Sequence, residues 1–234
     1  MKAVILAGGL GTRLRRLLPD TPKVLAPVGD KAFIEYILCQ LQKSEIKDVI
    51  LALGYKAKII KEYLQPKKYP NLSIMFSEEQ YPLGTGGAIK LAARFIEDDS
   101  FLVLNGDSFL AINLNDLVQY HISKKSFLTI ALTEVSNAKR FGSVEINING
   151  KLVGFKEKVD SNSVIINAGI YVINKNFLEV FPDGPSSLER DIIPKFLGSN
   201  IYGKLYKTFF IDIGTPESYC QILTDYKTLN NLLK

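Results

Sequence analysis

The sequence contains few of the residues on which metal centres and covalent catalysis usually depend. Its 234 residues include two cysteines, Cys39 and Cys220, and one histidine, His121. Neither cysteine belongs to a CxxC pair, so we expect small buried hydrophobic residues with no zinc, redox or disulfide role. A single histidine excludes a paired-histidine metal site and disfavours a Ser-His hydrolase. His121 falls in a stretch typical of a surface helix, and we expect no function for it.

Long apolar runs and dense clusters of basic residues are also missing. No apolar run reaches the length of about 18 residues typical of a membrane span. The N-terminal residues MKAVILAGG predict a strand and a glycine turn, not a basic segment with a cleavage site. We therefore expect a cytoplasmic protein that does not contact a membrane. The net charge of +5 comes from scattered residues, which argues against nucleic acid and equally fits a small anionic substrate.

Apolar runs alternate with helical periodicity through the first half of the chain. Short buried strands are predicted at residues 2–7, 48–53, 72–77 and 101–105, and helices at 33–41, 57–64 and 87–96. Such alternation specifies an α/β fold, with a mostly parallel sheet and helices on both faces. The 234 residues, 47% of them hydrophobic, predict one globular domain over 1–234.

The second half changes character. Strands predicted at 127–135, 143–148, 152–156 and 164–173 follow one another, and Asn149-Gly150 is a typical hairpin turn, so some antiparallel pairing is expected. Ser186 and Glu189 have capping-box spacing before a helix through Phe196, and residues 216–233 predict a terminal helix. Ligands of open α/β sheets bind beyond the carboxyl ends of the strands, so the segments that follow strands form the candidate site.

A glycine-rich segment follows the first strand. It consists of Leu6, Ala7, Gly8, Gly9, Leu10, Gly11, Thr12 and Arg13, and Lys23 stands ten residues further on. Glycines let backbone N–H groups approach phosphate oxygens, and two nearby cations could neutralise a pyrophosphate leaving group. The spacing does not fit a dinucleotide fingerprint, because Leu14 stands where its third glycine belongs. A Walker P-loop is also excluded, because no Gly-Lys-Ser/Thr occurs.

Two lone carboxylates close apolar strands. Asp107 follows Asn105-Gly106, and Asp212 precedes Ile213-Gly214. A hard cation such as Mg²⁺ takes carboxylate oxygen and otherwise keeps phosphate and water ligands, so two aspartates suffice for a metal site. On the local pattern alone, each aspartate could instead cap a turn or a helix.

These motifs together resemble those of the sugar-nucleotide pyrophosphorylase family. Residues 8–14 with Pro22-Lys23 are similar to its G-G-x-G-T-R-L and Pro-Lys signature, and N-G-D and D-I-G-T-P motifs follow in order. The resemblance implies a Rossmann-like, glycosyltransferase-A-like fold. It divides the chain into a nucleotide-binding part at about 1–125, a small antiparallel sugar-binding part at about 126–215 and a C-terminal helix at 216–234.

The resemblance also implies roles for single residues. It makes Arg13 and Lys23 the transition-state cations, and Asp107 and Asp212 the catalytic carboxylates that share Mg²⁺. The residues that it assigns to the nucleotide are Leu6, Ala7, Gly8, Gly9, Gly11, Thr12, Glu79, Gly84, Thr85 and Gly106.

Two further matches concern the substrates. Glu79 stands five residues before Gly84, in a segment that resembles the family's P-L-G-T-x-G loop over the nucleobase. Relatives specific for other bases carry an amide there, whereas a carboxylate can accept guanine N1–H and N2–H together, so GTP is favoured. A solvated glutamate would fit the same pattern.

On the sugar side, residues 155–158 resemble the family's F-x-E-K-P motif, with Val159 in place of the proline. The residues that the resemblance assigns to the sugar 1-phosphate are Gly142, Glu157, Lys158, Asn167 and Gly169. By composition alone, Glu157 and Lys158 would equally suit a charged strand edge.

No Ser, Cys or His nucleophile has a supporting base in the sequence, so direct displacement at the α-phosphorus is expected. Within the family the chain most resembles D-glycero-alpha-D-manno-heptose 1-phosphate guanylyltransferases. Enzymes that transfer GMP to mannose 1-phosphate, CMP to glucose 1-phosphate or UMP to N-acetylmuramate 1-phosphate are close competitors. The rival of another class is a non-catalytic sugar-nucleotide sensor, against which the full set of cations and carboxylates argues. A homodimer is compatible with the sequence.

Overall fold

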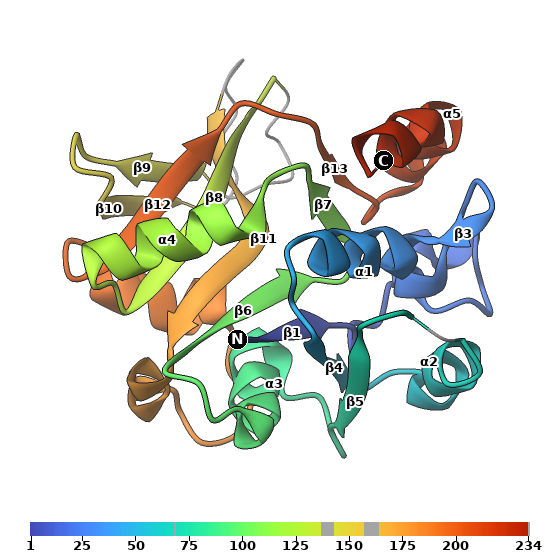
Figure 1. The fold of residues 1–234 in the computed structure, drawn as a ribbon, viewed down its shortest axis with the longest axis horizontal. Coiled ribbons are helices and arrows are strands. Elements are labelled where there is room, and N and C mark those ends of the chain that lie inside the picture. Colours follow the sequence, from blue (N-terminus) through green and yellow to red (C-terminus); the bar gives the residue numbers. More distant parts are fainter. Residues whose placement is uncertain (68, 137–142, 157–163, 234) are drawn as a thin grey trace.

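The computed structural model describes residues 1–67, 69–136, 143–156 and 164–233, and within them a nine-stranded mixed sheet forms the centre of the molecule (Figure 1). Four parallel strands lie in the order β6 (Ser100–Asn105), β1 (Lys2–Leu6), β4 (Asp48–Leu53) and β5 (Ser73–Glu78). The central strands of this group are buried on both faces, which explains their continuous apolar sequences.

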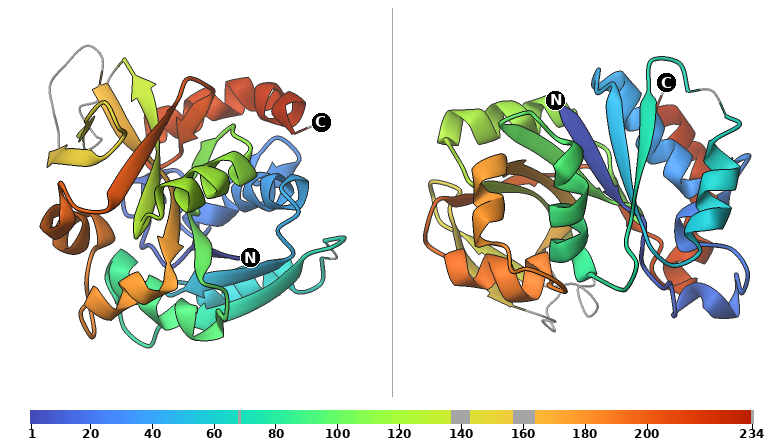
Figure 2. Two further views of the ribbon diagram at one scale, coloured as in Figure 1. Left: turned by 60° about the vertical axis from the view of Figure 1, so that its left-hand side comes forward. Right: turned by 90° about the horizontal axis from the view of Figure 1, so that it is seen from below.

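Helices cover both faces of the sheet, as expected. The α-helices are α1 (Phe33–Lys43), α2 (Ala57–Leu64), α3 (Gly84–Ala92), α4 (Leu114–Lys124) and α5 (Pro216–Leu232). Ala3 and Ile5 of β1 belong to the core shared with α1, α2, α4 and α5, whereas Val4 belongs to the core shared with α3. Because successive strand residues point to opposite faces, α3 lies on the other side of the sheet from α1 (Figure 2).

The second half adds largely antiparallel strands. These are β8 (Leu128–Val135), β9 (Ser143–Ile146), β10 (Leu152–Lys156), β11 (Val164–Asn174) and β12 (Ile201–Tyr206). Strand β11 pairs with both β6 and β8, so it joins the two halves of the sheet. The predicted hairpin is present between β9 and β10, and Gly150 in its turn has a φ of +80°. Strand β12, parallel to β8, was not predicted.

Short elements complete the fold. Short strands occur at β2 (Pro27–Val28), β3 (Lys31–Ala32), β7 (Ser108–Leu110) and β13 (Phe210–Asp212), and 3-10 helices at Leu14–Arg16, Lys23–Leu25, Ala93–Phe95, Lys175–Val180 and Ile193–Phe196. No helix in the described part of the chain is long and apolar enough to cross a membrane.

The helix predicted before Phe196 differs from expectation. Leu188–Ile192 is a π-helix, which continues as the 3-10 helix that contains Pro194. Proline has no N–H to donate to an α-helical ladder, so a regular helix cannot run through it. The predicted capping box is also wrong: the Ser187 side chain accepts from Arg190 N–H at 3.2 Å, and Asp191, not Glu189, accepts from Ser187 N–H at 2.7 Å.

The expectation for the cysteines is also wrong, and the position of His121 adds a detail that the sequence did not predict. Cys220 is exposed and Cys39 is half-buried, so neither is a fully buried core residue. His121 lies in the expected helix, α4, but its side chain is only 2% exposed. Leu114, Leu117, Val118 and His121 follow helical spacing and are all buried, which places the histidine on the apolar face of α4.

Candidate active site

A cavity of about 520 Å³ opens at the carboxyl ends of β1, β4 and β6. Parallel strands bring the segments that follow them to one edge of the sheet, which is where the sequence placed the candidate site. The predicted site residues that line it are Leu6, Ala7, Gly8, Gly9, Lys23, Glu79, Gly84, Thr85 and Asp107. Gly54, Tyr55, Gln80, Tyr81 and Asn105 line it as well and were not predicted.

The glycine turn after β1 packs closely against the turn after β4. Tyr55 N–H donates to the Gly8 carbonyl oxygen at 3.3 Å. A Cβ on Gly8 would lie 3.1 Å from Gly54 N, so a side chain here would press against the neighbouring backbone. A Cβ on Gly9 would meet nothing within 4 Å. The space in front of the Gly9 backbone is therefore free for a phosphate group.

Three residues predicted to bind the nucleotide do not line the cavity: Gly11, Thr12 and Gly106. Gly11 has a φ of +59°, a left-handed conformation that favours glycine. Gly106 N–H donates to the Leu6 carbonyl oxygen at 3.0 Å, and a Cβ on Gly106 would lie 2.7 Å from that oxygen. Gly106 thus holds the loop that carries Asp107 close against the end of β1.

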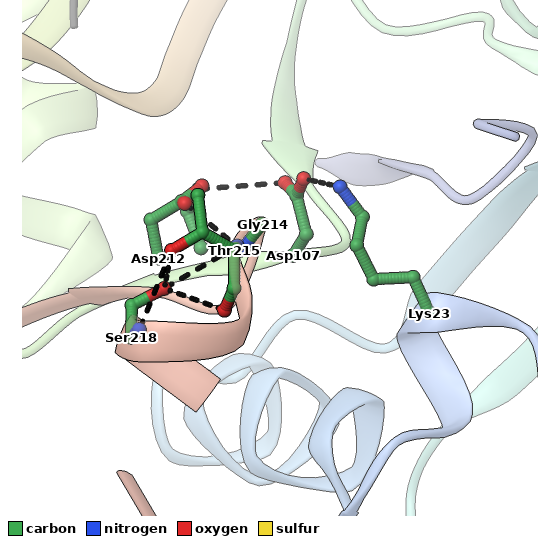
Figure 3. Close-up of polar contacts among 7 residues, drawn as sticks. Lys23, Asp107, Asp212, Gly214, Thr215 and Ser218 are labelled. Carbon is green, nitrogen blue, oxygen red and sulfur yellow. Dashed lines mark hydrogen bonds and ion pairs between the residues drawn. The ribbon is translucent and has the colours of Figure 1, made fainter. Parts of the chain in front are cut away.

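Asp107 and Asp212 meet because two short strands pair. Strand β7 starts directly after Asp107 and pairs antiparallel with β13, so that Asp212 lies opposite Ser108. The Ser108 hydroxyl lies 3.4 Å from Asp107 Oδ1 and 3.2 Å from Asp212 Oδ2. Figure 3 shows Asp107 between Lys23 and Asp212. The two carboxylates are therefore neighbours, although 105 positions separate them in the chain, and of the two only Asp107 lines the cavity.

Both predicted cations lie beside these carboxylates. Lys23 Nζ forms an ion pair with Asp107 Oδ2, and the two side chains are 16% and 23% exposed. Arg13 is exposed and reaches the turn after β13, where its Nη2 lies 3.4 Å from the position that a Gly214 Cβ would occupy. The structure thus brings Arg13, Lys23, Asp107 and Asp212 together from three separate segments.

The donor set at this edge suits a hard divalent cation. Within the described residues no group of three or more His, Cys, Asp or Glu side chains could hold a metal. Two carboxylates that flank one hydroxyl nevertheless fit Mg²⁺, which usually takes one or two carboxylates and completes its shell with phosphate and water oxygens. Asp107 and Asp212 would hold such an ion.

Glu79 lies on the opposite wall, at the end of β5. Its Oε2 accepts from Leu83 N–H at 3.0 Å, and its own N–H donates to the Leu53 carbonyl oxygen at 2.9 Å. Burial raises the pKa of the Glu79 carboxyl above its ordinary value, and the Leu83 N–H opposes that shift only in part. A half-buried acceptor facing a cavity is suited to a ligand that brings N–H donors.

The sugar side is described in part. Gly142, Glu157 and Lys158 lie outside the described residues. Asn167 and Gly169 lie where β11 shifts register against β8, and Gly169 has a φ of +77°. A Cβ on Gly169 would lie 2.6 Å from Asn105 Nδ2. The bulge therefore places Gly169 beside Asn105, a residue of the cavity wall, and Asn167 accepts from Gly169 N–H.

A chain of hydrogen bonds, which we call the Glu189 network, links this bulge to α3. Asn167 Nδ2 donates to Tyr171 Oη at 2.7 Å, and Tyr171 Oη donates to Glu189 Oε1 at 2.9 Å. The other oxygen of Glu189 accepts from Thr85 Oγ1 at 2.7 Å and from Ser187 Oγ at 3.0 Å. The sequence signals did not single out Tyr171, and they gave Glu189 only a capping role.

Next to the Glu189 network, backbone hydrogen bonds join the segment around Gly84, on the nucleotide side, to Ser186 in the second half of the chain. Gly86 N–H donates to the Ser186 carbonyl oxygen at 2.8 Å, and Ser186 N–H donates to the Leu83 carbonyl oxygen at 2.8 Å. A Cβ on Gly84 would lie 2.5 Å from that Ser186 oxygen. The loop before α3 and the first turn of α3, which carry Glu79, Gly84 and Thr85, are thus fixed to the second half of the chain.

Comparison with known proteins agrees with this geometry. The family described as Nucleotidyl transferase matches residues 2–228. The chain belongs to the nucleotidyl transferase family. It is 40% identical over 221 residues to a D-glycero-alpha-D-manno-heptose 1-phosphate guanylyltransferase of Aneurinibacillus thermoaerophilus, a match that covers 94% of this chain and 95% of the relative. A mannose-1-phosphate guanylyltransferase of Mycobacterium tuberculosis is 34% identical over 222 residues, covering 93% of this chain and 62% of the relative.

A solved structure of this family has the same fold. HddC from Yersinia pseudotuberculosis, crystallised in complex with GMP-PN, superimposes with a TM-score of 0.87 at 35% identity, covering 96% of this chain and 99% of that one. The family and the α/β fold expected from the motifs are therefore confirmed. As a nucleotidyl transferase, the chain is an enzyme whose candidate active site lies at the edge of its sheet.

Proposed function

We propose that this nucleotidyl transferase moves GMP from GTP to D-glycero-alpha-D-manno-heptose 1-phosphate, releases pyrophosphate and supplies a GDP-sugar for surface polysaccharide synthesis. The observation that carries the transfer chemistry is the clustering of Arg13 and Asp212 next to Lys23 and Asp107, the two members of the group that line the cavity. A module that only binds sugar nucleotides has little need of cations placed beside two carboxylates. The base and the sugar rest on the relatives that carry these activities and on Glu79 in the cavity wall.

The reaction follows as a direct displacement. The phosphate oxygen of the sugar 1-phosphate attacks the α-phosphorus of GTP, and the bond to the β,γ-pyrophosphate breaks on the opposite side. A sugar phosphate is already anionic near neutral pH, so its oxygen needs no general base. Lys158 is assigned to hold that phosphate, and Glu157, Asn167, Gly142 and Gly169 the sugar.

The cations act on the charge that moves to the leaving group. Arg13 screens the departing pyrophosphate, and Lys23, which lines the cavity beside Asp107, offers its ammonium group to a phosphate oxygen. Mg²⁺ held by Asp107 and Asp212 would supply further charge neutralisation and orient the triphosphate. The backbone at Gly8 and Gly9 provides the close wall for the phosphates.

An assay of pyrophosphate release over the four common NTPs and several sugar 1-phosphates tests the proposal. We expect the highest kcat/KM for GTP with the heptose 1-phosphate. Mannose 1-phosphate is the alternative sugar that the mycobacterial relative suggests, and a higher kcat/KM with it would replace the heptose assignment. Absence of pyrophosphate release with every pair would overturn the proposal in favour of a non-catalytic sugar-nucleotide sensor.

The Glu189 network predicts an effect on the sugar. Tyr171 is fully buried, and its hydroxyl fixes one N–H of the Asn167 amide, whose oxygen already accepts from Gly169 N–H at 2.9 Å. Tyr171→Phe removes only that hydroxyl. We expect the KM for the sugar 1-phosphate to rise about tenfold, the cost of one lost hydrogen bond, while the KM for GTP stays within twofold. Equal rises in both constants would contradict this role.

A further inference from the structure

We propose that Gly54 is a specificity-determining residue, because its lack of a side chain leaves the space in which the Glu79 carboxylate lies when it reads a guanine base. The inference rests on the proposed function, since Gly54 acts through the Glu79 carboxylate. It concerns a residue that directly follows β4 and that no motif in the sequence singled out.

The contact geometry at Gly54 is unusually specific. A Cβ built there would lie 2.2 Å from Glu79 Oε1, 3.0 Å from its Cδ and 3.1 Å from its Cγ. The three nearest atoms thus all belong to one side chain. The backbone does not demand glycine, since the φ of Gly54 lies outside the left-handed region. An alanine at this position is unstrained in its backbone but collides with the carboxylate.

Glu79 has little room to yield on its other sides. Leu83 N–H holds Oε2 at 3.0 Å, and the backbone of Glu79 is fixed to β4 by its hydrogen bond to Leu53. Oε1 also borders Gly8, whose Cβ would lie 3.3 Å from it. Gly8, Gly54 and Glu79 all line the cavity. A methyl group at residue 54 must therefore push the carboxylate out of its present place, toward the space that a ligand occupies.

The chemistry of the base turns this displacement into a change of selectivity. Guanine presents N1–H and the N2 amino group side by side, and one carboxylate can accept from both. Hypoxanthine, the base of ITP, keeps N1–H but lacks the N2 amino group. The ratio of kcat/KM for GTP to that for ITP therefore reports how well the carboxylate reaches the second donor.

The test compares this ratio in the 234-residue enzyme and in its variants. Gly54→Ala is expected to lower the GTP/ITP ratio about tenfold, the worth of a hydrogen bond to a charged acceptor, mainly through a higher KM for GTP. The KM for the sugar 1-phosphate should stay within twofold. Glu78→Ala is the control: it removes the neighbouring carboxylate, which forms an ion pair with Lys61 and does not line the cavity, so the ratio should not change.

A double-mutant cycle separates failure of this inference from failure of the proposed function. Glu79→Ala should lower the ratio, and Gly54→Ala added to it should change nothing more, because the colliding atoms are gone. If Glu79→Ala leaves the GTP/ITP ratio unchanged, Glu79 does not read the base, and the inference about Gly54 is overturned as well. If Glu79→Ala lowers the ratio but Gly54→Ala does not, only the inference about Gly54 fails.

The same variants test the inference even if Gly54→Ala fails to fold. Should Gly54→Ala not fold alone, folding of the Gly54→Ala/Glu79→Ala variant, measured by thermal unfolding, would support the collision with Glu79. If the double variant is equally unfolded, the need for glycine lies elsewhere and the inference is overturned.

Discussion

Replacing Asp107 by asparagine is expected to lower kcat about a thousandfold while the protein stays folded. Asparagine keeps the shape of the side chain but offers a divalent cation a neutral oxygen in place of a carboxylate, and it cannot pair with Lys23. Loss of one preorganised charge at a transition state typically costs about 100-fold to 1,000-fold in kcat. Pyrophosphate release at saturating substrates measures the change, and thermal unfolding reports whether the fold survives.

A matched aspartate provides the control. Asp116 on α4 also accepts from a lysine, Lys204, at 2.6 Å, but that pair is exposed and neither residue lines the cavity. Asp116→Asn should leave kcat within twofold, because neither member of this pair lines the cavity. The variant should also stay folded, because exposed ion pairs contribute little to stability. Near-normal Mg²⁺-dependent turnover by the Asp107→Asn variant would refute the assignment of Asp107.

The rigid position of Asp107 explains why replacing one carboxylate oxygen by an amide nitrogen is expected to lower kcat so strongly. Gly106 fixes the loop to β1, and Ile213 N–H donates to the Asp107 carbonyl oxygen at 2.9 Å, so the backbone is held on both sides. The carboxylate is thus placed before any substrate arrives. Preorganised groups of this kind contribute more to catalysis than flexible ones, because no reorganisation is needed during the reaction.

Much of the first half of the fold could be predicted from the sequence. Strands that are buried on both faces must be apolar throughout, and β1, β4 and β6 were found within one residue of their observed ends. The glycine turn and the carboxylates at the strand ends then followed from the rule that ligands bind at that edge. The positions of these strands and of the residues at their ends can thus be predicted from local sequence patterns, without knowledge of distant contacts.

Other parts depend on contacts that no local pattern reveals. Ser108 and Asp212 come together only through the pairing of β7 with β13, two three-residue strands far apart in the chain. Glu189 has capping-box spacing, yet its carboxylate accepts from Thr85, 104 positions away, and from Tyr171, 18 positions away. The requirement for glycine at residue 54 likewise depends on the Glu79 side chain, which lies against the turns after β4 and β1.

The burial of His121 follows from the spacing of the apolar residues in its helix. Leu114, Leu117 and Val118 precede it at the spacing of one helix face, so the apolar side of α4 passes through the histidine. In the structure His121 Nδ1 lies 2.9 Å from Thr129 Oγ1, and Nε2 lies 3.4 Å from Ser100 Oγ. Burial lowers the pKa of the imidazole from 6.5 to about 4, so it is neutral in the folded protein at neutral pH.

This buried histidine should make the protein lose stability in mild acid. Below pH 6.5 the unfolded chain takes up a proton that the folded chain binds only near pH 4, so the free energy of unfolding falls as the pH falls through that window. Between pH 7.5 and pH 5 the loss should be about 2 kcal/mol, at 1.36 kcal/mol for each unit below 6.5. Urea unfolding at the two pH values measures it.

The effect can be assigned to one residue because the sequence has no other histidine. His121→Asn keeps a polar group near Thr129 but cannot titrate. It should lower stability at pH 7.5 and flatten the dependence on pH down to pH 5. The contribution of Glu79 to the free energy of unfolding has the opposite sign. Its raised pKa means that the folded protein binds this proton more readily than the unfolded chain, so this contribution grows as the pH falls. An undiminished acid loss in the His121→Asn variant would show that another group causes it.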